Sequence, residues 1–542
     1  MTELYKQYII YSMEIKTPLT MWNNYDKSGN TNETIVSHAD CGDYDEYHVY
    51  FNGDIVSDGI TRIYAKFYTP KTETPVPAVL FFDDSKNTLG FEHIKVLLDE
   101  GFAVLYVDYL GKREGVCRYT LYPDSIIGSK QKGLCENLRE SKFYVYGCIG
   151  LKALNYLQSK EIVQSNNIGV LGVGNASSIV WTLAVKEKLK AGMTFYGGGF
   201  VWDENRTDPR YLLYKAAFDI RSYALHAQFP VLIQAASNEK NNALDYLTEL
   251  YDCSDKHYFS IAPRARRAVA TAQKKNLKYW FSQMLINNQV LPTAPEINAR
   301  QSDGKLYYDL DINEEQEVSF VKLFTSQGDE EAAFRNWSEQ KVEKVVPGKY
   351  ISRVDVYTEN EPIRAFAVVK YLHSLYLTSS VLLKMPMQMK VIAEKQTSRL
   401  IYDNDMGLDD FLVPNDYDVK YNEEKLVMRK GPYDIEGVCS MTGQLTTFKI
   451  GDYKYKGNSD ASLKILLSVE NTCNVTFTVM DKERTVYSCV KECAKEDGWC
   501  SVSLAPFDFK SQKSVLSNWN NVVSITITNE ETKLILSSML WV

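Results

Sequence analysis

A turn made of small residues is the first place in this sequence where groups suited to nucleophilic chemistry gather. Residues 168–178 read Ile-Gly-Val-Leu-Gly-Val-Gly-Asn-Ala-Ser-Ser, an apolar run that ends in small residues and then in two hydroxyls. A serine hydroxyl becomes a nucleophile when a base within hydrogen-bond reach accepts its proton. Ser177 and Ser178 fall on the first turn of a predicted helix, where serine commonly bonds to nearby backbone. We therefore favour a local structural use for both, with recruitment of one as a displaced nucleophile as the alternative.

Charged side chains follow the neighbouring apolar runs. They are Asp83 and Asp84 after residues 78–82, Glu239 after 230–234, and Arg264, Arg266 and Arg267 after 257–261. In one interpretation the arginines neutralise the carboxylates and form a closed ion-pair network. In the other, the arginines and the backbone N–H groups of a helix start bind an anionic ligand. The candidate ligand-binding residues are then Asp83, Asp84, Gly174, Asn175, Arg264 and Arg266. We favour the network.

These groups are positioned by an alternation of strands and helices. Short, continuous apolar runs predict buried strands at 78–82, 102–107, 168–171, 191–195, 230–234 and 257–261, and helical spacing recurs at 91–100, 142–159, 176–188, 241–251 and 268–285. Two alternating strands, 46–51 and 61–68, precede them around a turn at 52–54. The pattern predicts an α/β domain with a doubly wound, mainly parallel sheet, whose functional groups lie at the carboxyl ends of the strands.

The same segments, taken in order, resemble the α/β-hydrolase fold. The resemblance is carried by residues 77–82, 101–111, 168–178, 230–239 and 257–267, and it covers roughly residues 45–290. The subgroup that it is most similar to comprises dienelactone-hydrolase-like and acetyl-xylan-esterase-like enzymes, many of which act on acylated small molecules or sugars. The resemblance implies a Ser-His-acid triad, with the nucleophile on a sharp G-x-S-x-G turn between a strand and a helix.

The triad positions implied by this resemblance carry other side chains. Gly174 occupies the nucleophile position, Glu239 matches the acid, and Arg267 stands near the histidine position. The resemblance also implies a His-Gly motif after the first buried strand, at the site that stabilises the oxyanion. Asp83-Asp84-Ser85 stands there instead and puts negative charge where a developing oxyanion requires hydrogen-bond donors. The resulting hypothesis is a catalytically degenerate esterase-type protein with a binding or scaffolding role related to carbohydrate. The alternative is an active carboxylic-ester hydrolase or deacetylase that uses a nonstandard nucleophile.

The remainder of the chain is predicted to be almost entirely β. After a linker at 291–295, residues 296–395 resemble an immunoglobulin-like β-sandwich, with one helix expected at 329–337. Residues 396–542 resemble the jelly-roll carbohydrate-binding modules, on the segments 496–510 and 516–527. We therefore predict three domains: an α/β-hydrolase-like domain at 1–290, an immunoglobulin-like sandwich at 296–395, and a jelly roll at 396–542.

Two ligand questions arise from the jelly-roll resemblance. The aromatic candidates for stacking on a sugar ring are Tyr433, Tyr453 and Tyr455. Modules of this kind often hold a structural calcium, and the oxygen-rich turn containing Asp403 and Asp405 is where it would bind. The turn lacks the bidentate glutamate of a twelve-residue calcium loop, so we expect no cofactor, with calcium at this turn as the alternative.

Charge and composition narrow the partners. The net charge is −8, the sequence pI is about 5.5, and no basic block is present, which argues against nucleic-acid binding. No apolar run approaches the length of a membrane-spanning helix, so no membrane partner is expected. The first residues lack the pattern of a secretory signal, which predicts a cytoplasmic protein with reduced cysteines. The expected partner is a small molecule or an oligosaccharide.

Overall fold

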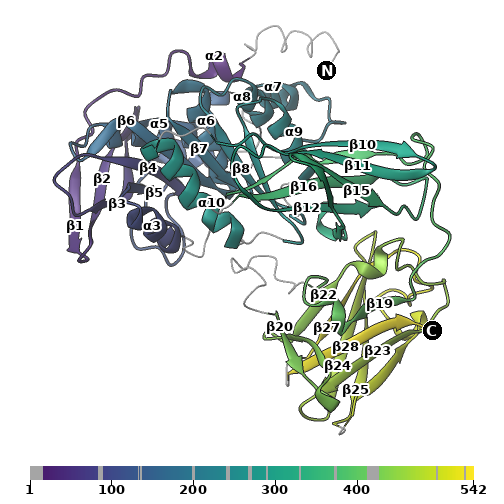
Figure 1. The fold of residues 1–542 in the computed structure, drawn as a ribbon. Helices are drawn as coiled ribbons and strands as arrows, with labels where there is room; N and C mark the ends of the chain where they lie inside the picture. The colour runs from purple at the N-terminus through teal and green to yellow at the C-terminus, as the bar shows by residue number, and fades with distance from the viewer. Residues whose placement is uncertain are drawn as a thin grey trace, which may run out of the picture.

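The computed structural model divides into one mixed α/β unit and two β units (Figure 1). It describes residues 16–83, 90–131, 134, 137–197, 202–239, 244–265, 271–287, 291–328, 331–371, 375–411, 426–495, 498–529 and 533–542.

The first unit is built on a nine-stranded sheet with the order β1-β2-β3-β5-β4-β6-β7-β8-β9. Its strands are β1 (Thr34–Asp40), β2 (Tyr44–Val56), β3 (Gly59–Pro70), β4 (Val76–Asp83), β5 (Ala103–Val107), β6 (Val163–Val173), β7 (Ala191–Phe195), β8 (Val231–Ala236) and β9 (Tyr258–Ala262). The six strands from β5 to β9 along the sheet are parallel, whereas β1, β2 and β3 pair antiparallel. The predicted α/β class with a mainly parallel sheet is confirmed.

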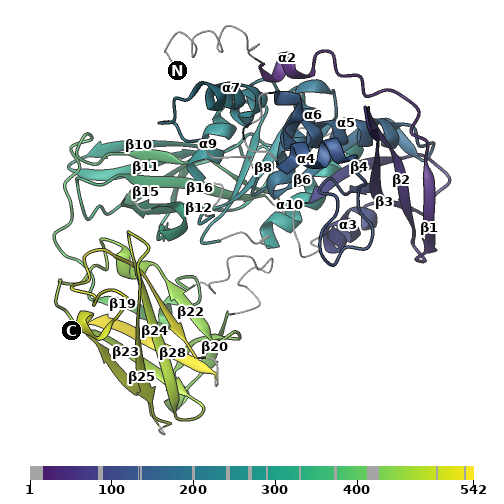
Figure 2. The same cartoon turned by 180° about the vertical axis from the view of Figure 1, so that it is seen from behind.

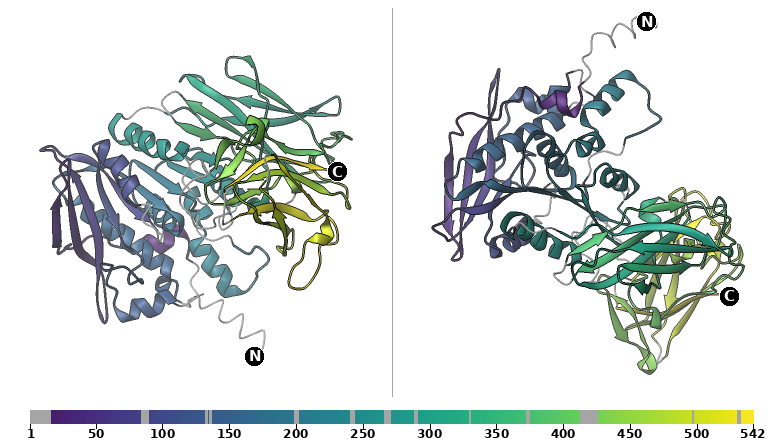
Figure 3. Two further views of the ribbon diagram at one scale, coloured as in Figure 1. Left: turned by 90° about the horizontal axis from the view of Figure 1, so that it is seen from below. Right: turned by 45° about the horizontal axis from the view of Figure 1, so that its top comes forward.

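Helices cover both faces of this sheet (Figures 1 and 3). They are α2 (Pro18–Trp22), α3 (Gly90–Asp99), α4 (Asp124–Gln131), α5 (Lys142–Gln158), α6 (Ser177–Lys186), α7 (Pro209–Phe218), α8 (Ile220–Leu225), α9 (Leu244–Asp252) and α10 (Thr271–Phe281), the last followed by a π-helical turn at Ser282–Asn287. Leu80 and Phe82 face the core beneath α5 and α6, while Val79 and Phe81 face the core beneath α3 and α10. The alternation explains why β4 is apolar at every position.

The first hairpin turns later than the sequence predicts. Residues 52–54, expected as the turn, lie within β2, and the chain reverses between Val56 and Gly59. The register shifts between Asn52 and Ile55, so the Asn-Gly-Asp sequence forms a bulge. Gly53 allows the close approach, because a Cβ there would lie 3.0 Å from the Cβ of Thr61.

The second unit consists of two antiparallel sheets. One has the order β10-β11-β15-β14, and the other has β13-β12-β16-β17 with β18 also on β16. The strands are β10 (Glu296–Ser302), β11 (Lys305–Asp311), β12 (Val318–Gln327), β13 (Ser338–Gln340), β14 (Glu343–Val346), β15 (Lys349–Val354), β16 (Ile363–Tyr371), β17 (Tyr376–Thr378) and β18 (Leu382–Lys384). The helix predicted at 329–337 is wrong for the described part of that segment, where only a single 3₁₀ turn, Ala332–Phe334, forms before the chain becomes extended.

The third unit also consists of two antiparallel sheets (Figure 2). β20 (Leu426–Lys430), β21 (Glu436–Ser440), β28 (Leu534–Trp541), β23 (Leu463–Val469) and β26 (Cys500–Leu504) form one, with β19 (Leu400–Asp403) also on β28. β22 (Gln444–Thr447), β27 (Val522–Thr528), β24 (Cys473–Asp481) and β25 (Val486–Cys493) form the other. Trp519 and Trp541 are buried between them, 5.3 Å apart at their ring centroids.

The hydrophobic cores do not follow the three units one to one. Apolar residues of the second unit, such as Trp337 and Phe366, belong to the same core as α5 and α6 of the first, whereas the third unit has a core of its own. In the described part of the chain no helix combines the length and the apolar character needed to cross a bilayer.

Candidate functional site

The turn after β6 has the geometry of a sharp strand-to-helix elbow. β6 ends at Val173, Gly174 has a φ of +61°, and a 3₁₀ turn at Gly174–Ala176 leads directly into α6. A positive φ of this kind is uncommon for residues with a side chain. Gly174, which is buried, therefore forms the apex of such a turn and offers no group that could attack a substrate.

The elbow is sealed from one side by the chain that follows β7. A Cβ on Gly197 would lie 1.9 Å from the carbonyl oxygen of Gly174 and 2.2 Å from the Ser177 hydroxyl, so only glycine fits there. Ser177 is fully buried beneath this contact and donates its hydroxyl to the Gly172 carbonyl at 3.2 Å. Ser178 donates to the Asn175 carbonyl at 2.8 Å. Both hydroxyls serve the local turn, as the sequence analysis favours.

Two carboxylates lie at the same edge of the sheet. Asp83, the last residue of β4, is the register partner of Val173 and so stands beside the elbow. Glu239 follows β8 by one turn, in which its N–H donates to the Ala236 carbonyl. Both side chains are buried, and the charge of Asp83 adds to burial in raising the pKa of Tyr106. The exposed Asn175 lies on the 3₁₀ turn that precedes α6.

Arg264 does not join these carboxylates in an ion pair. It follows β9 with a φ of +54°, and its Nε donates to the Trp337 carbonyl at 2.6 Å. Its guanidinium forms an ion pair with Asp409 at 3.4 Å. The favoured network of Arg264 with Asp83 and Glu239 is therefore wrong for this arginine, because the left-handed turn directs its side chain to the second and third units. Asp84, Arg266 and Arg267 lie outside the described residues.

The segment Arg335-Asn336-Trp337, whose Trp337 carbonyl accepts the hydrogen bond of Arg264, also contacts the first and third units. Arg335 is buried and donates to both oxygens of Asp245 on α9, at 2.8 and 2.7 Å, which lowers the pKa of that carboxyl against the effect of burial. Asn336 donates to Asp452 of the third unit at 2.6 Å. Asn238, next to Glu239, donates to the Arg335 carbonyl at 2.8 Å. This segment therefore links all three units beside the sheet edge.

The described histidines lie elsewhere. His257 precedes β9 at the opposite end of the strand, donates its Nε2–H to the Ala224 carbonyl at 3.1 Å, and packs edge-on against Trp181. Burial lowers its pKa to about 4. His93 is buried on α3 against Phe195, and His38 and His48 lie on the antiparallel strands. Within the described residues, no histidine follows β9 as a triad would require.

The acidic turn of the third unit surrounds a lysine. Asp403 ends β19, and Asp405 lies on the 3₁₀ turn Asn404–Met406. The buried Lys449 donates to the Ile401 carbonyl at 3.0 Å and to Asp410 at 2.5 Å. Burial lowers the pKa of Lys449 although Asp410 opposes this. Among the described residues no group of three histidine, cysteine or acidic side chains is arranged to hold a metal ion.

The chain is similar over part of its length to a curated protein and to several solved structures. No family model matches the sequence. The protein named "Putative hydrolase YtaP" from Bacillus subtilis (strain 168) is 28% identical over 155 residues, which is 24% of this chain and 48% of that protein. The chain thus spans about half the length of the curated relative it matches.

Several solved structures are also similar. Acetyl xylan esterase 1 from Thermoanaerobacterium sp. JW/SL YS485 is 16% identical, with 54% of this chain and 99% of that chain covered and a TM-score of 0.40. The acetyl xylan esterase from Paenibacillus sp. R4 is 15% identical, with 53% and 100% covered and a TM-score of 0.41. The dienelactone hydrolase-like enzyme P91 from metagenomic libraries is 15% identical, with 45% and 99% covered and a TM-score of 0.32.

Sequence reasoning missed the side chains that join the units. Asn238, Asp245 and Asn276 show no motif, and Asn276 is buried in a reciprocal pair of bonds with the backbone of Tyr376, at 2.9 and 2.7 Å. Arg335-Asn336-Trp337 resembles a segment of multidomain esterases that carry such a sandwich, but that resemblance did not indicate these contacts. A polar residue of a helix that binds another domain's backbone leaves no periodic trace in sequence.

Proposed function

We propose that this chain is an esterase-type α/β-hydrolase relative that has lost its serine triad and acts by binding or scaffolding, on a carbohydrate-related ligand. The observation that carries the proposal is Gly174 at the apex of the elbow, with a φ of +61° and no side chain. Catalysis by a serine triad requires a hydroxyl at that apex and a base within hydrogen-bond reach.

The neighbouring groups support the loss of hydrolysis. Ser177 is buried under Gly197 and Ser178 bonds within its own turn, so neither hydroxyl is presented to the edge. Asp83 is buried at the place where a tetrahedral intermediate would need hydrogen-bond donors. Arg264, which follows β9, is bound to Trp337 and Asp409. Each of these features favours a structural or binding role for the edge.

The carbohydrate part of the proposal rests on the third unit. Of the three candidate tyrosines, Tyr455 is buried and Tyr453 is half-buried, whereas Tyr433 is 77% exposed on the hairpin between β20 and β21. A Cβ on Gly498 would lie 3.2 Å from the Tyr433 hydroxyl, so the residue preceding Trp499 is next to it. An exposed ring with a polar tip is suited to stacking on a sugar. Tyr433 is the platform that we propose.

The decisive experiment is intact-mass analysis after incubation with a fluorophosphonate, which modifies serines activated as nucleophiles. We expect no adduct. A stoichiometric adduct would overturn the proposal in favour of an active ester hydrolase, and peptide mapping would identify the serine.

A gain-of-function variant tests the same point from the other side. Gly174→Ser should restore the hydroxyl at the elbow but give no turnover of p-nitrophenyl acetate, because the described residues place no histidine after β9. Turnover should require a histidine at Arg266 or Arg267 as well. Clear turnover by the single variant would contradict the loss of the base.

A further inference from the structure

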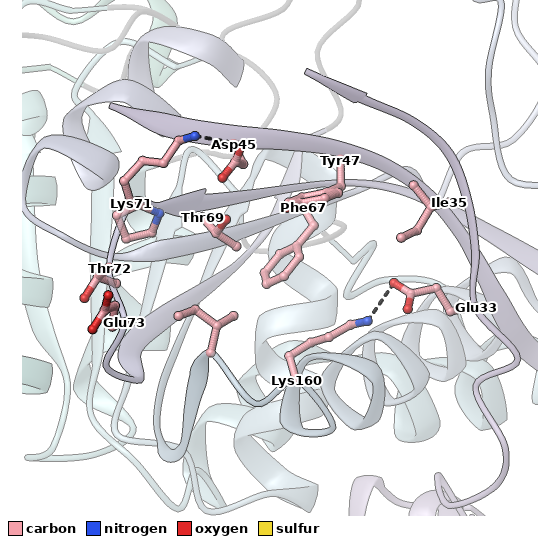
Figure 4. A pocket seen from close by; sticks show the side chains of 12 residues that line it. Glu33, Ile35, Asp45, Tyr47, Phe67, Thr69, Lys71, Thr72, Glu73 and Lys160 are labelled. Carbon is pink, nitrogen blue, oxygen red and sulfur yellow. Dashed lines mark hydrogen bonds and ion pairs between the residues drawn. The ribbon is translucent and has the colours of Figure 1, made fainter. Parts of the chain in front are cut away.

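A pocket opens at the end of the α/β sheet opposite to the elbow. It has a volume of about 510 Å³ and lies between β1, β2, β3 and the connection from α5 to β6 (Figure 4). The residues that line it include Ile35, Tyr47, Phe67, Lys71 and Lys160. Its size falls within the range of small-molecule sites.

The pocket forms because helix α5 is shorter than the face of β2 on which it packs, so the end of that face is left uncovered. Val49 and Phe51 on β2 are buried under α5, and Phe51 stacks on Tyr156 with ring centroids 4.2 Å apart. α5 ends at Gln158, so Tyr47 and Asp45, further along the same face of β2, extend past its cover. Side chains two residues apart on a strand share a face. The face of β2 that packs against the core therefore extends beyond α5, and there it forms the floor of the pocket.

The floor is aromatic and aliphatic. Tyr47 and Phe67 are directly opposite each other on β2 and β3, and the ring of Tyr47 is held from the other side by His38, 4.5 Å away and nearly parallel. Ile35 is 55% exposed at one margin of the floor. Burial, together with the charge of Asp45, raises the pKa of Tyr47, so its hydroxyl is neutral and can donate.

The two ends of the pocket are each closed by an ion pair. Lys160 contacts Glu33 at 2.6 Å, and Lys71 contacts Asp45 at 3.3 Å (Figure 4). Lys71 also contacts Asp40, which does not line the pocket, at 2.9 Å. A cationic or anionic ligand would have to separate one of these pairs. A neutral ligand leaves both pairs intact and can accept hydrogen bonds from the ammonium groups and donate them to the carboxylates.

We propose that this pocket binds a neutral saccharide of one or two rings. The apolar face of a pyranose ring would lie on Tyr47 and Phe67, and its hydroxyl edge would reach the two ion pairs. This inference is independent of the proposed function, because the pocket shares no residue with the elbow or with the hairpin that carries Tyr433.

The test uses the full chain and three probes: methyl β-D-glucopyranoside, xylobiose and cellobiose. Titration calorimetry should detect at least one of them with a Kd of about 1 mM or tighter. Ile35→Arg places a long cation across the mouth from an exposed position and should weaken binding at least about tenfold. Ile55→Arg, at an exposed position of β2 outside the pocket, is the matched control and should bind as the wild type does.

Two further measurements keep the outcomes separate. Tyr47→Ala should also weaken binding, with near-UV circular dichroism as the check that the sheet is intact. Tyr433→Ala removes the platform proposed in the third unit, so the binding that remains in this variant is assigned to the pocket and should be weakened when Ile35→Arg is added. Absence of binding by all three sugars would overturn the proposal. Binding that survives Ile35→Arg but is lost in Tyr433→Ala would also overturn it and would place the sugar site in the third unit.

Discussion

The junction between the first and second units differs in kind from the junction between the second and third. At the first, buried polar side chains bond across a shared apolar core: Arg335 to Asp245, Asn238 to the backbone at Ala332 and Arg335, and Asn276 to Tyr376. At the second, the buried cluster that the described residues share consists of Ala333, Phe334, Phe448 and Val523. Its polar contacts include Asn336 with Asp452, which is partly buried, and Arg484 with Glu331, in which both side chains are about half-exposed.

The difference teaches that units assigned by sequence need not be units of stability. A continuous core couples the unfolding of the parts that share it, whereas a small contact allows each part to open separately. We expect the first two units to unfold together and the third in a transition of its own.

The largest effect is expected from the tryptophan at the shared core. Trp337 is buried and packs edge-on against Phe366 at 4.8 Å, so Trp337→Ala should destabilise the joint transition by about 3–5 kcal/mol. The measurement is chemical denaturation, monitored by near-UV circular dichroism. Trp519→Ala, an equally buried tryptophan in the third unit, is the matched control and should shift only the other transition. If each variant shifted both transitions equally, the comparison between the junctions would be wrong.

The next effect separates a buried ion pair from an exposed one. Arg335→Met removes the partner of Asp245 at a buried position and should cost about 3 kcal/mol, at the lower end for such pairs because Asp245 is half-exposed. Arg484→Met removes a pair in which both side chains are about half-exposed, and should cost less than about 1 kcal/mol. Denaturant midpoints of the two variants measure the contrast, and comparable losses would contradict it.

A third effect depends on pH. His257 has a pKa of about 4 in the folded protein because burial disfavours its charged form, so the unfolded chain binds the proton more readily. The contribution of the neutral His257 to the free energy of unfolding is fully present above the unfolded pKa of about 6.5, and it is lost as the pH falls from there through 4. By pH 5 the free energy of the joint transition should have fallen by about 2 kcal/mol. No histidine occurs in residues 396–542, so the third unit lacks this loss.

The variant His257→Gln isolates that contribution. Glutamine can still donate to the Ala224 carbonyl, and it does not titrate. The joint transition of this variant should change less between pH 7.5 and pH 5 than that of the wild type, by about the same 2 kcal/mol. Equal changes in the two proteins would show that His257 is not buried as a neutral ring.

Most of the α/β architecture was predictable, because strands buried on both faces leave continuous apolar runs. β4, β5 and β7 match the expected segments within about two residues. The elbow at Gly174 was predictable from its small residues and from the resemblance to hydrolases. The direction of Arg264 was not, because it depends on a left-handed turn and on partners 73 and 145 positions away, Trp337 and Asp409. The pocket at Tyr47 was missed because it depends on where α5 ends relative to a distant strand.

The smallest effect is a difference in thiol reactivity between the first and third units, with no change in stability. The third unit buries its cysteines except Cys500, which is partly buried. Cys493 is fully buried opposite Cys473, and burial raises its pKa to about 12. The first unit instead exposes Cys41 and Cys117. Since only the thiolate is alkylated, a thiol with a pKa of about 12 has at pH 8 a thiolate fraction on the order of a thousandfold below that of an ordinary cysteine.

Brief treatment with iodoacetamide, followed by peptide mass spectrometry, should label Cys41 and Cys117 first and leave Cys493 unmodified. All ten cysteines should react once the chain is denatured, which is the control for accessibility. Rapid labelling of Cys493 in the native protein would mean that the third unit opens far more often than its separate core implies.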